Sequence, residues 1–307
     1  MNEKIQKIFN YCYNSITVGD QKNWDYSTVD ANVLEKFEHY IEYYSYDYIK
    51  LAYLDLIKEH QSSKFSYFIK TPENFLFFFE LSRRIGDTVM PYIKSIEAKF
   101  ATRLVDYLSN ETDDNIKKYL AMNKIEVKDE FYWLNLDPNT KITTKLRFSS
   151  FGTLKQVYKR VLSDDKKPEI ANYMFNGLNK DNYKIFGEVL DCLVKFRNII
   201  AHNGSILCTD IHYYLNNASI KQVCKVFNIE FNIDTDSSFA LMLKLVNCLI
   251  STDIQKDVDE SIAEKFQHLE EKSKNPNNSS WNIDDSSTYL KKLRQIGITK
   301  YMFIKGV

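Results

Sequence analysis

An arginine and a histidine near the end of one apolar helix are the residues in this sequence best suited to chemistry. Four residues separate Arg197 from His202, and Asn198 directly follows the arginine. Arginine is scarce, with seven among the 41 basic residues, and the chain has only five histidines. A guanidinium can bind two phosphate oxygens at once, and an imidazole titrates near neutral pH. The pair therefore supplies two groups that phosphodiester chemistry requires.

RNA can be cleaved without a metal ion when its own 2′-hydroxyl attacks the phosphorus. The reaction then needs proton transfer, which suits His202, and a cation against the developing charge, which suits Arg197. Asn198 is placed to bind the phosphate or to orient the imidazole. One arginine and one histidine are few for a complete site, so we expect two copies to face each other in a symmetric dimer. The competing interpretation is structural, because a histidine in the last helical turn is favoured by the dipole and an arginine can simply pair with an acid.

Other catalytic signatures are absent from the sequence. It has no Walker loop and no HExxH, GxSxG or GxGxxG motif, and its histidines lack metal-ligand spacing. Five cysteines without a CxxC pair argue against a disulfide framework or a zinc cluster. Cys192 lies on an apolar helical stripe and is expected in the core. We therefore expect neither a metal nor a cofactor.

The elements that position this pair are predicted to be helices. Apolar residues recur at three- and four-residue steps from Ile185 to Ile200, and Gly204 predicts the end of that helix. Only 8 Gly and 5 Pro, against 21 Tyr and 20 Phe, favour long helices with short connections. Further long helices are predicted over residues 33–57, with a potential interruption at its cluster of tyrosines, and over residues 71–108, with a potential break at Gly86. Residues 125–136 are the most strand-like part, but the predicted fold class is all-α.

Basic residues gather locally, although the formal net charge of the chain is zero. The window of residues 141–160 contains no acid, and residues 286–307 form a second acid-free basic patch. The first window is either a solvated helix face or a surface that contacts phosphates, with an aromatic ring among the cations to stack on RNA. The RNA-binding candidates are Lys141, Lys145, Arg147, Lys155, Tyr158, Lys159 and Arg160.

The chain is predicted to form one α-helical domain over residues 1–272. A loop at residues 273–287 then leads to a docked C-terminal segment at residues 288–307. The N-terminus lacks the features of a signal peptide, and no run of eighteen apolar residues is present. A cytoplasmic protein without a membrane partner is therefore expected.

Three stretches, in order, resemble the Abi (abortive infection) family of bacterial phage-defence proteins. The first is residues 79–108, which include Glu97 and Arg103. The second is the Ser-Phe-Gly-Thr-Leu stretch at residues 150–154, followed by Tyr158 and Lys159. The third is residues 193–203, where Arg-Asn-x3-His resembles the HEPN signature R-x4-6-H. The resemblance spans about residues 75–205 and rests on the order and spacing of these blocks.

The resemblance implies a HEPN-like helical bundle, with additional N- and C-terminal helices, and a metal-independent endoribonuclease. Its composite site would form when two R-x4-H motifs meet in a homodimer, and an RNA or protein antitoxin would restrain it. Arg197, Asn198 and His202 match the catalytic motif; Glu97 matches an acidic position and, with Asn203, would support the site. The chain departs from the family after the histidine, where residues 203–206 lack a basic side chain. A non-catalytic RNA-binding HEPN scaffold and a helical protein–protein adaptor remain as alternatives.

Overall fold

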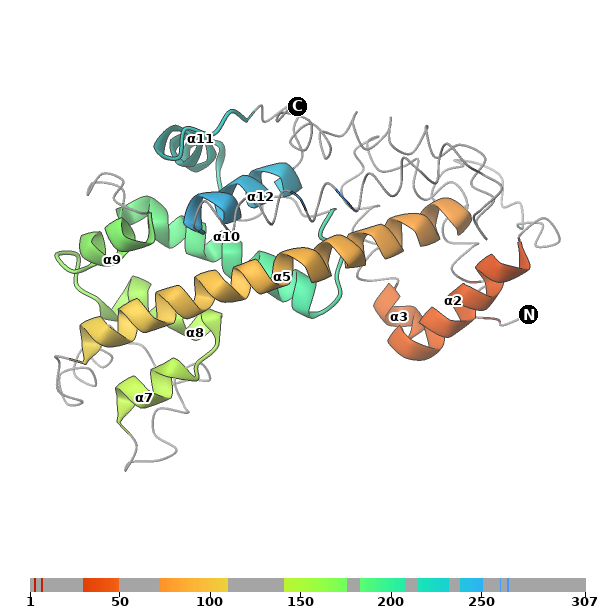
Figure 1. Ribbon diagram of the computed structural model, residues 1–307, viewed down its shortest axis with the longest axis horizontal. Coiled ribbons are helices and arrows are strands. Elements are labelled where there is room, and N and C mark those ends of the chain that lie inside the picture. The colour runs from red at the N-terminus through yellow and green to blue at the C-terminus, as the bar shows by residue number, and fades with distance from the viewer. Residues whose placement is uncertain are drawn as a thin grey trace.

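The predicted all-α fold class is confirmed. The computed structural model describes residues 30–49, 72–109, 141–175, 183–207, 215–231 and 238–250, together with residues 3, 7, 260 and 264. Within these ranges the regular elements are all helical (Figure 1). They are α2 (Ala31–Tyr44), α3 (Tyr46–Ile49), α5 (Pro72–Leu108), α7 (Ile142–Arg147), α8 (Phe151–Gln156), the π-helical turn η5 (Val157–Val161), α9 (Lys167–Met174), α10 (Tyr183–Ala201), α11 (Asn217–Val226) and α12 (Ser238–Leu249).

The long helix α5 is the element on which most of the others pack. It contacts α2, α7, α8, α9, α10 and α12, and Figure 1 shows it crossing most of the molecule. The potential break at Gly86 does not occur, because α5 is continuous through this residue. A Cβ atom at Gly86 would lie 3.2 Å from Cγ2 of Ile200. This glycine therefore permits the close approach of α10 to α5 and does not end the helix.

The helix predicted over residues 33–57 is interrupted in its middle. Helix α2 ends before Ser45, whose φ of 66° lies in the left-handed region, and α3 begins at the next residue. Asp30 caps α2 by accepting a hydrogen bond of 2.7 Å from the backbone N–H of Asn32. The ring of Phe37 stacks on that of Phe75 at 5.9 Å between centroids, which attaches α2 to the first turns of α5.

An aromatic cluster joins α5, α8, η5 and α10 in the core. The ring of Phe100 lies 6.2 Å from Phe151, 5.9 Å from Tyr158 and 5.7 Å from Phe186, all between centroids. Tyr158 and Phe186 meet edge to face at 5.1 Å. These contacts hold α5 and α10 together with the continuous α8–η5 segment, and they place the start of α8 beside the C-terminal part of α5.

Several predicted segments lie outside the described residues. They are the strand-like residues 125–136, the loop at 273–287 and the C-terminal segment at 288–307. None of the described helices combines the length and the apolar character that crossing a membrane requires.

Candidate active site at the end of helix α10

The position of His202 is set by the way in which α10 ends. The backbone N–H of Gly204 donates to the carbonyl of Ile199 at 2.7 Å, and that of Asn203 donates to Ile200 at 2.9 Å. Asn203 has a φ of 52°, in the left-handed region. These are the two hydrogen bonds of a Schellman motif, which closes the last turn of a helix. His202 is thus the last residue before the chain reverses.

The left-handed residue at this helix end is Asn203, and not the glycine that signalled the end of the helix in the sequence. Gly204 instead has a packing role, since a Cβ there would lie 3.1 Å from Cγ2 of Ile199 and 3.2 Å from its carbonyl oxygen. Asparagine tolerates the left-handed conformation better than most residues. The structure therefore gives Asn203 a role in ending the helix.

Arg197 is brought next to Glu97 by the packing of α10 against α5. Its Nε lies 3.7 Å from Oε2 of Glu97, and the two side chains are 29% and 16% exposed, respectively. The backbone N–H of Phe151, at the start of α8, also bonds to Glu97. The N–H groups in the first turn of a helix have no partner within the helix, so a carboxylate at this position satisfies one of them. Glu97 thereby connects all three stretches of the sequence that resemble the Abi family.

The surroundings of Glu97 act on its pKa in opposite directions. Burial, which has the largest effect, raises the pKa of the carboxyl above its ordinary value, while Arg197, the Phe151 N–H and Lys94 each lower it. The direction of the balance is upward. Removal of the carboxylate from water thus outweighs the attraction of the cations around it.

The guanidinium of Arg197 is only partly bonded. Its Nη1 donates to Oδ1 of Asn198 at 3.3 Å, whereas its buried Nε has no hydrogen-bond partner, since 3.7 Å to Glu97 is too long. Arginine carries five N–H donors in a planar fork. The arrangement therefore holds the side chain in place and leaves donors that an anion can accept from.

His202 is exposed at the surface, and its backbone N–H donates to the carbonyl of Asn198 at 3.0 Å. Asn198 is thus one helical turn from His202 and adjacent to Arg197. Five helical positions separate the Cα atoms of Arg197 and His202 by about 7.5 Å along the axis and by about 140° around it. One copy of the chain therefore gathers Glu97, Arg197 and Asn198 at a helix surface and exposes the imidazole of His202 one turn further along, on a different side of the helix.

Arg103, which accompanies Glu97 in the sequence, belongs to a different cluster. Its Nη2 lies 2.5 Å from Oε1 of Glu169 on α9, and its guanidinium carbon lies 5.0 Å from the centre of the Tyr173 ring. Proximity in the sequence does not determine whether Arg103 or Arg197 pairs with Glu97. The crossing of α5 with α10 places Arg197 next to Glu97.

The basic window at residues 141–160 meets acidic residues from other elements. Asp191 on α10 pairs with Lys155 at 2.9 Å and with Lys159 at 2.5 Å. Asp106 on α5 lies 4.0 Å from Arg147, and both of these side chains are largely exposed. Asp191 therefore neutralises part of the charge of Lys155 and Lys159. The positive charge that is more accessible to a ligand than these two lysines lies at the N-terminal end of the window and at Arg160.

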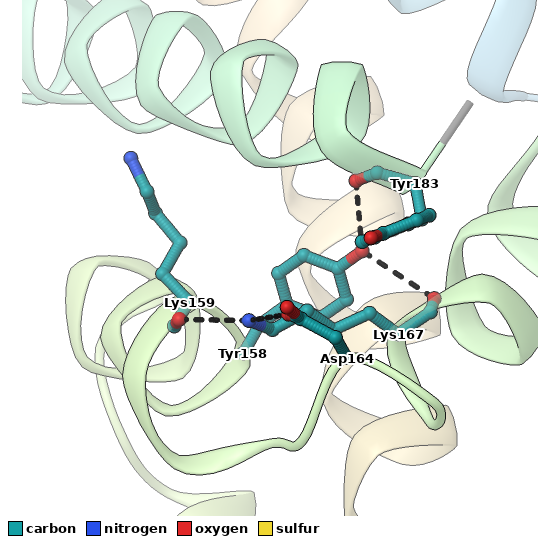
Figure 2. Close-up of polar contacts among 5 residues, drawn as sticks. All are labelled: Tyr158, Lys159, Asp164, Lys167 and Tyr183. Carbon is teal, nitrogen blue, oxygen red and sulfur yellow. Dashed lines mark hydrogen bonds and ion pairs between the residues drawn. The ribbon is translucent and has the colours of Figure 1, made fainter. Parts of the chain in front are cut away.

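The prediction that Tyr158 stacks on RNA is wrong, because its ring lies in the core. The side chain is 1% exposed, and its hydroxyl donates to the carbonyls of Tyr183 at 3.1 Å and of Lys167 at 3.4 Å (Figure 2). Burial raises the pKa of this phenol further above its ordinary value. A tyrosine among cations in the sequence thus faces inward on its helix, while the cations face outward.

The π-helical turn η5 that contains Tyr158 borders a pocket of about 610 Å³. Figure 2 shows the ammonium of Lys167 in this region, where it donates to the Lys159 carbonyl at 3.1 Å and to Asp164 at 2.9 Å. The lining includes Arg160 but none of Glu97, Arg197 and His202. This pocket is therefore separate from the cluster at the end of α10.

The expectation that Cys192 is a core residue is confirmed, as its side chain is buried. Burial raises the pKa of its thiol, so it remains protonated and unsuited to act as a nucleophile. Among the residues that the structure describes, no group of three His, Cys, Asp or Glu side chains has the arrangement of a metal site. Cys208, His60, His212 and His268 lie outside those residues.

Comparison with known proteins gives a family match over part of the chain. Residues 137–208 match the family model described as Abi-like protein. This match supports membership in the Abi family. The matched region contains the Ser150–Leu154 stretch and the Arg197–His202 motif, whereas Glu97 lies before it. Abi membership suggests a role in abortive infection, a form of phage defence. No curated protein and no solved structure gave a significant match.

Proposed function

We propose that this protein is a HEPN-type endoribonuclease of the Abi family that acts in phage defence. The observation that carries the proposal is the cluster of Glu97, Arg197 and Asn198, with an exposed His202 one helical turn beyond Asn198. It is formed by the three stretches that resemble the family. An arginine that is oriented but retains unbonded donors is suited to hold a phosphate, and an accessible imidazole at the end of the same helix is suited to transfer protons.

In the proposed reaction the 2′-hydroxyl of the RNA loses a proton to a histidine and attacks the adjacent phosphorus. The bond from phosphorus to the 5′-oxygen breaks, and that oxygen receives a proton. The products are a 2′,3′-cyclic phosphate and a 5′-hydroxyl end. The guanidinium of Arg197 stabilises the additional negative charge on the phosphorane, and Asn198 orients the arginine through its Oδ1.

A homodimer forms part of the proposal, because two proton transfers are needed and each copy contributes one R-x4-H motif. Two copies that meet at the ends of their α10 helices would supply two imidazoles and two guanidiniums around one phosphate. In the cell, an RNA or protein antitoxin would restrain the activity. Glu97 is a positioning residue in this scheme, since it contacts Arg197 and not the substrate.

The test is cleavage of total RNA by purified protein in EDTA, followed by analysis of the RNA ends. Cyclic phosphate ends are expected from the wild type, and loss of proton transfer by His202→Ala should reduce the rate by about 10²- to 10⁴-fold. His39→Ala is the matched control, because His39 is also exposed but lies on α2. Equal cleavage by the wild type and His202→Ala, or cleavage that EDTA abolishes, would contradict the proposal. Growth inhibition in cells should follow the same order of variants.

A further inference from the structure

The turn between α7 and α8 presents an aromatic ring to solvent. Phe148 is 86% exposed, which is the largest value among the exposed large hydrophobic side chains in the described part of the chain. The other two are Tyr43, at 72%, and Tyr173, at 46%. Tyr173 lies beside Lys99 and Arg103, which cover its ring. An exposed phenylalanine has no polar atom to account for its exposure, so its position calls for another explanation.

The backbone around Phe148 holds the ring in a defined place. The N–H of Phe148 donates to the carbonyl of Lys145 at 3.1 Å, and that of Ser149 donates to Leu146 at 3.1 Å. The hydroxyl of Ser149 also donates to the Lys145 carbonyl, at 3.0 Å. Ile142 and Leu146 bury the other side of α7 in the core. The ring therefore projects from a turn that is fixed at several points.

Basic residues flank this ring in the chain, and the candidate active site is linked to the same turn through Phe151. Lys141, which precedes α7, and Arg147, at its end, are both exposed, and the only acid paired with either in the described part of the chain is Asp106, 4.0 Å from Arg147. Two residues lie between Phe148 and Phe151, so their Cα atoms are at most about 10 Å apart. The N–H of Phe151 bonds to Glu97, the partner of Arg197. Figure 1 shows α7 and α8 on the same side of α5.

We propose that Phe148 is a base-stacking platform that binds an unpaired nucleotide of single-stranded RNA next to the phosphate held at Arg197. Stacking on an aromatic ring together with backbone contacts to cations is the way in which many proteins bind single strands without sequence preference. Lys141 and Arg147 contact the phosphates that flank the stacked base. This inference rests on the proposed function for the nature of its ligand, and it assigns to Phe148 the role that the sequence had assigned to Tyr158.

The experiment measures binding separately from cleavage. A short fluorescein-labelled single-stranded RNA is titrated with the His202→Ala protein, and its anisotropy gives Kd at a fixed salt concentration. Adding Phe148→Ala should weaken binding by about 5- to 150-fold, the usual range for one base–aromatic stack. Adding Phe148→Trp should retain affinity, and the indole fluorescence should be quenched by the RNA. Tyr43→Ala is the matched control and should leave Kd unchanged, because this exposed ring lies on α2.

Two further measurements separate stacking from a structural effect. The loss caused by Phe148→Ala should disappear on an RNA whose bases have been replaced by abasic sites, since only the phosphates then remain to be bound. An equal loss on both RNAs would overturn the stacking role. Size-exclusion chromatography with light scattering should show the same oligomeric state for Phe148→Ala and the wild type. A shift to monomer would instead assign the ring to contact between two copies and refute the proposal.

The outcomes distinguish this inference from the proposed function. Weaker RNA binding by Phe148→Ala, combined with a wild type that never cleaves RNA, supports the stacking platform and overturns the nuclease. Normal cleavage by the wild type with unchanged Kd and KM in Phe148→Ala supports the nuclease and overturns the platform. A wild type that does not bind RNA overturns both.

Discussion

The Glu97–Arg197 pair leads to an asymmetric prediction for protein stability. Arg197→Met removes the cation but keeps most of the side-chain volume, and it leaves a carboxylate that is 16% exposed without its main counter-charge. Breaking a fully buried ion pair costs about 3–5 kcal/mol, and breaking an exposed pair about 0–1 kcal/mol. Because both side chains are partly accessible, the expected loss in the free energy of unfolding is about 2–3 kcal/mol at pH 7.

Glu97→Gln should behave in the opposite way. The raised pKa of Glu97 means that burial of its charge costs more than Arg197 returns, so neutralising the carboxyl should leave stability unchanged or slightly increased at pH 7. The double variant Glu97→Gln/Arg197→Met should recover most of the unfolding free energy that Arg197→Met alone loses, since no unpaired carboxylate remains. Cleavage should nevertheless fall in Glu97→Gln, because Arg197 is held less firmly.

Lowering the pH offers an independent check. The folded-state pKa of Glu97 lies above its ordinary value of 4.5, so the folded protein binds this proton more tightly than the unfolded chain. Stability from this group is therefore fully present below the unfolded pKa and is lost as pH rises through the folded pKa. Removal of Arg197 raises the folded pKa further, so the cost of Arg197→Met should shrink towards zero as the pH falls below 4.5.

The assay is urea unfolding followed by circular dichroism, for the wild type, both single variants and the double variant. Arg147→Met is the control, because the Arg147–Asp106 pair is exposed and its atoms are 4.0 Å apart. Its effect on stability should stay below about 1 kcal/mol. If Arg197→Met costs no more than this control, or if Glu97→Gln fails to restore stability in the double variant, the described pairing is wrong.

Three further predictions concern the residues around this pair. Tyr158→Phe should lower the free energy of unfolding by about 1–2 kcal/mol, since it leaves the carbonyls of Tyr183 and Lys167 without this donor. A variant that is as stable as the wild type in urea would refute these hydrogen bonds. Asn203→Gly should preserve both stability and cleavage. Asn203→Ala should lower the free energy of unfolding by about 1 kcal/mol, because the φ of residue 203 is 52°. Loss of cleavage in a stable Asn203→Gly variant would show that the side chain acts in catalysis. Lys155→Met should weaken RNA binding less than Lys141→Met does, because Asp191 already neutralises Lys155, and the reverse order of Kd values would contradict that pairing.

The sequence was sufficient for the features that depend on local pattern. Few glycines and prolines and a three-to-four-residue apolar period predicted helices, and the described elements are helices. The end of α10 near residues 203–204 and the burial of Cys192 followed from the same periodicity. The order of three short stretches was enough to indicate the Abi family, and the match over residues 137–208 supports it. The proximity of Arg197, Asn198 and His202 also follows from the sequence, since all three lie within two turns of one helix.

Tertiary structure alone decided which distant residues meet. Glu97 had Arg103 nearby in the chain, but the crossing of α5 with α10 gave it Arg197 and the N–H of Phe151. The acid-free window received its acids from α5 and α10, and Tyr158 turned inward while Phe148 remained outside. Sequence spacing specifies the directions of side chains around one helix. Which of those directions faces the core depends on the neighbouring helices. The packing of these helices therefore determined the charge partners in this protein and left the ring of Phe148 exposed.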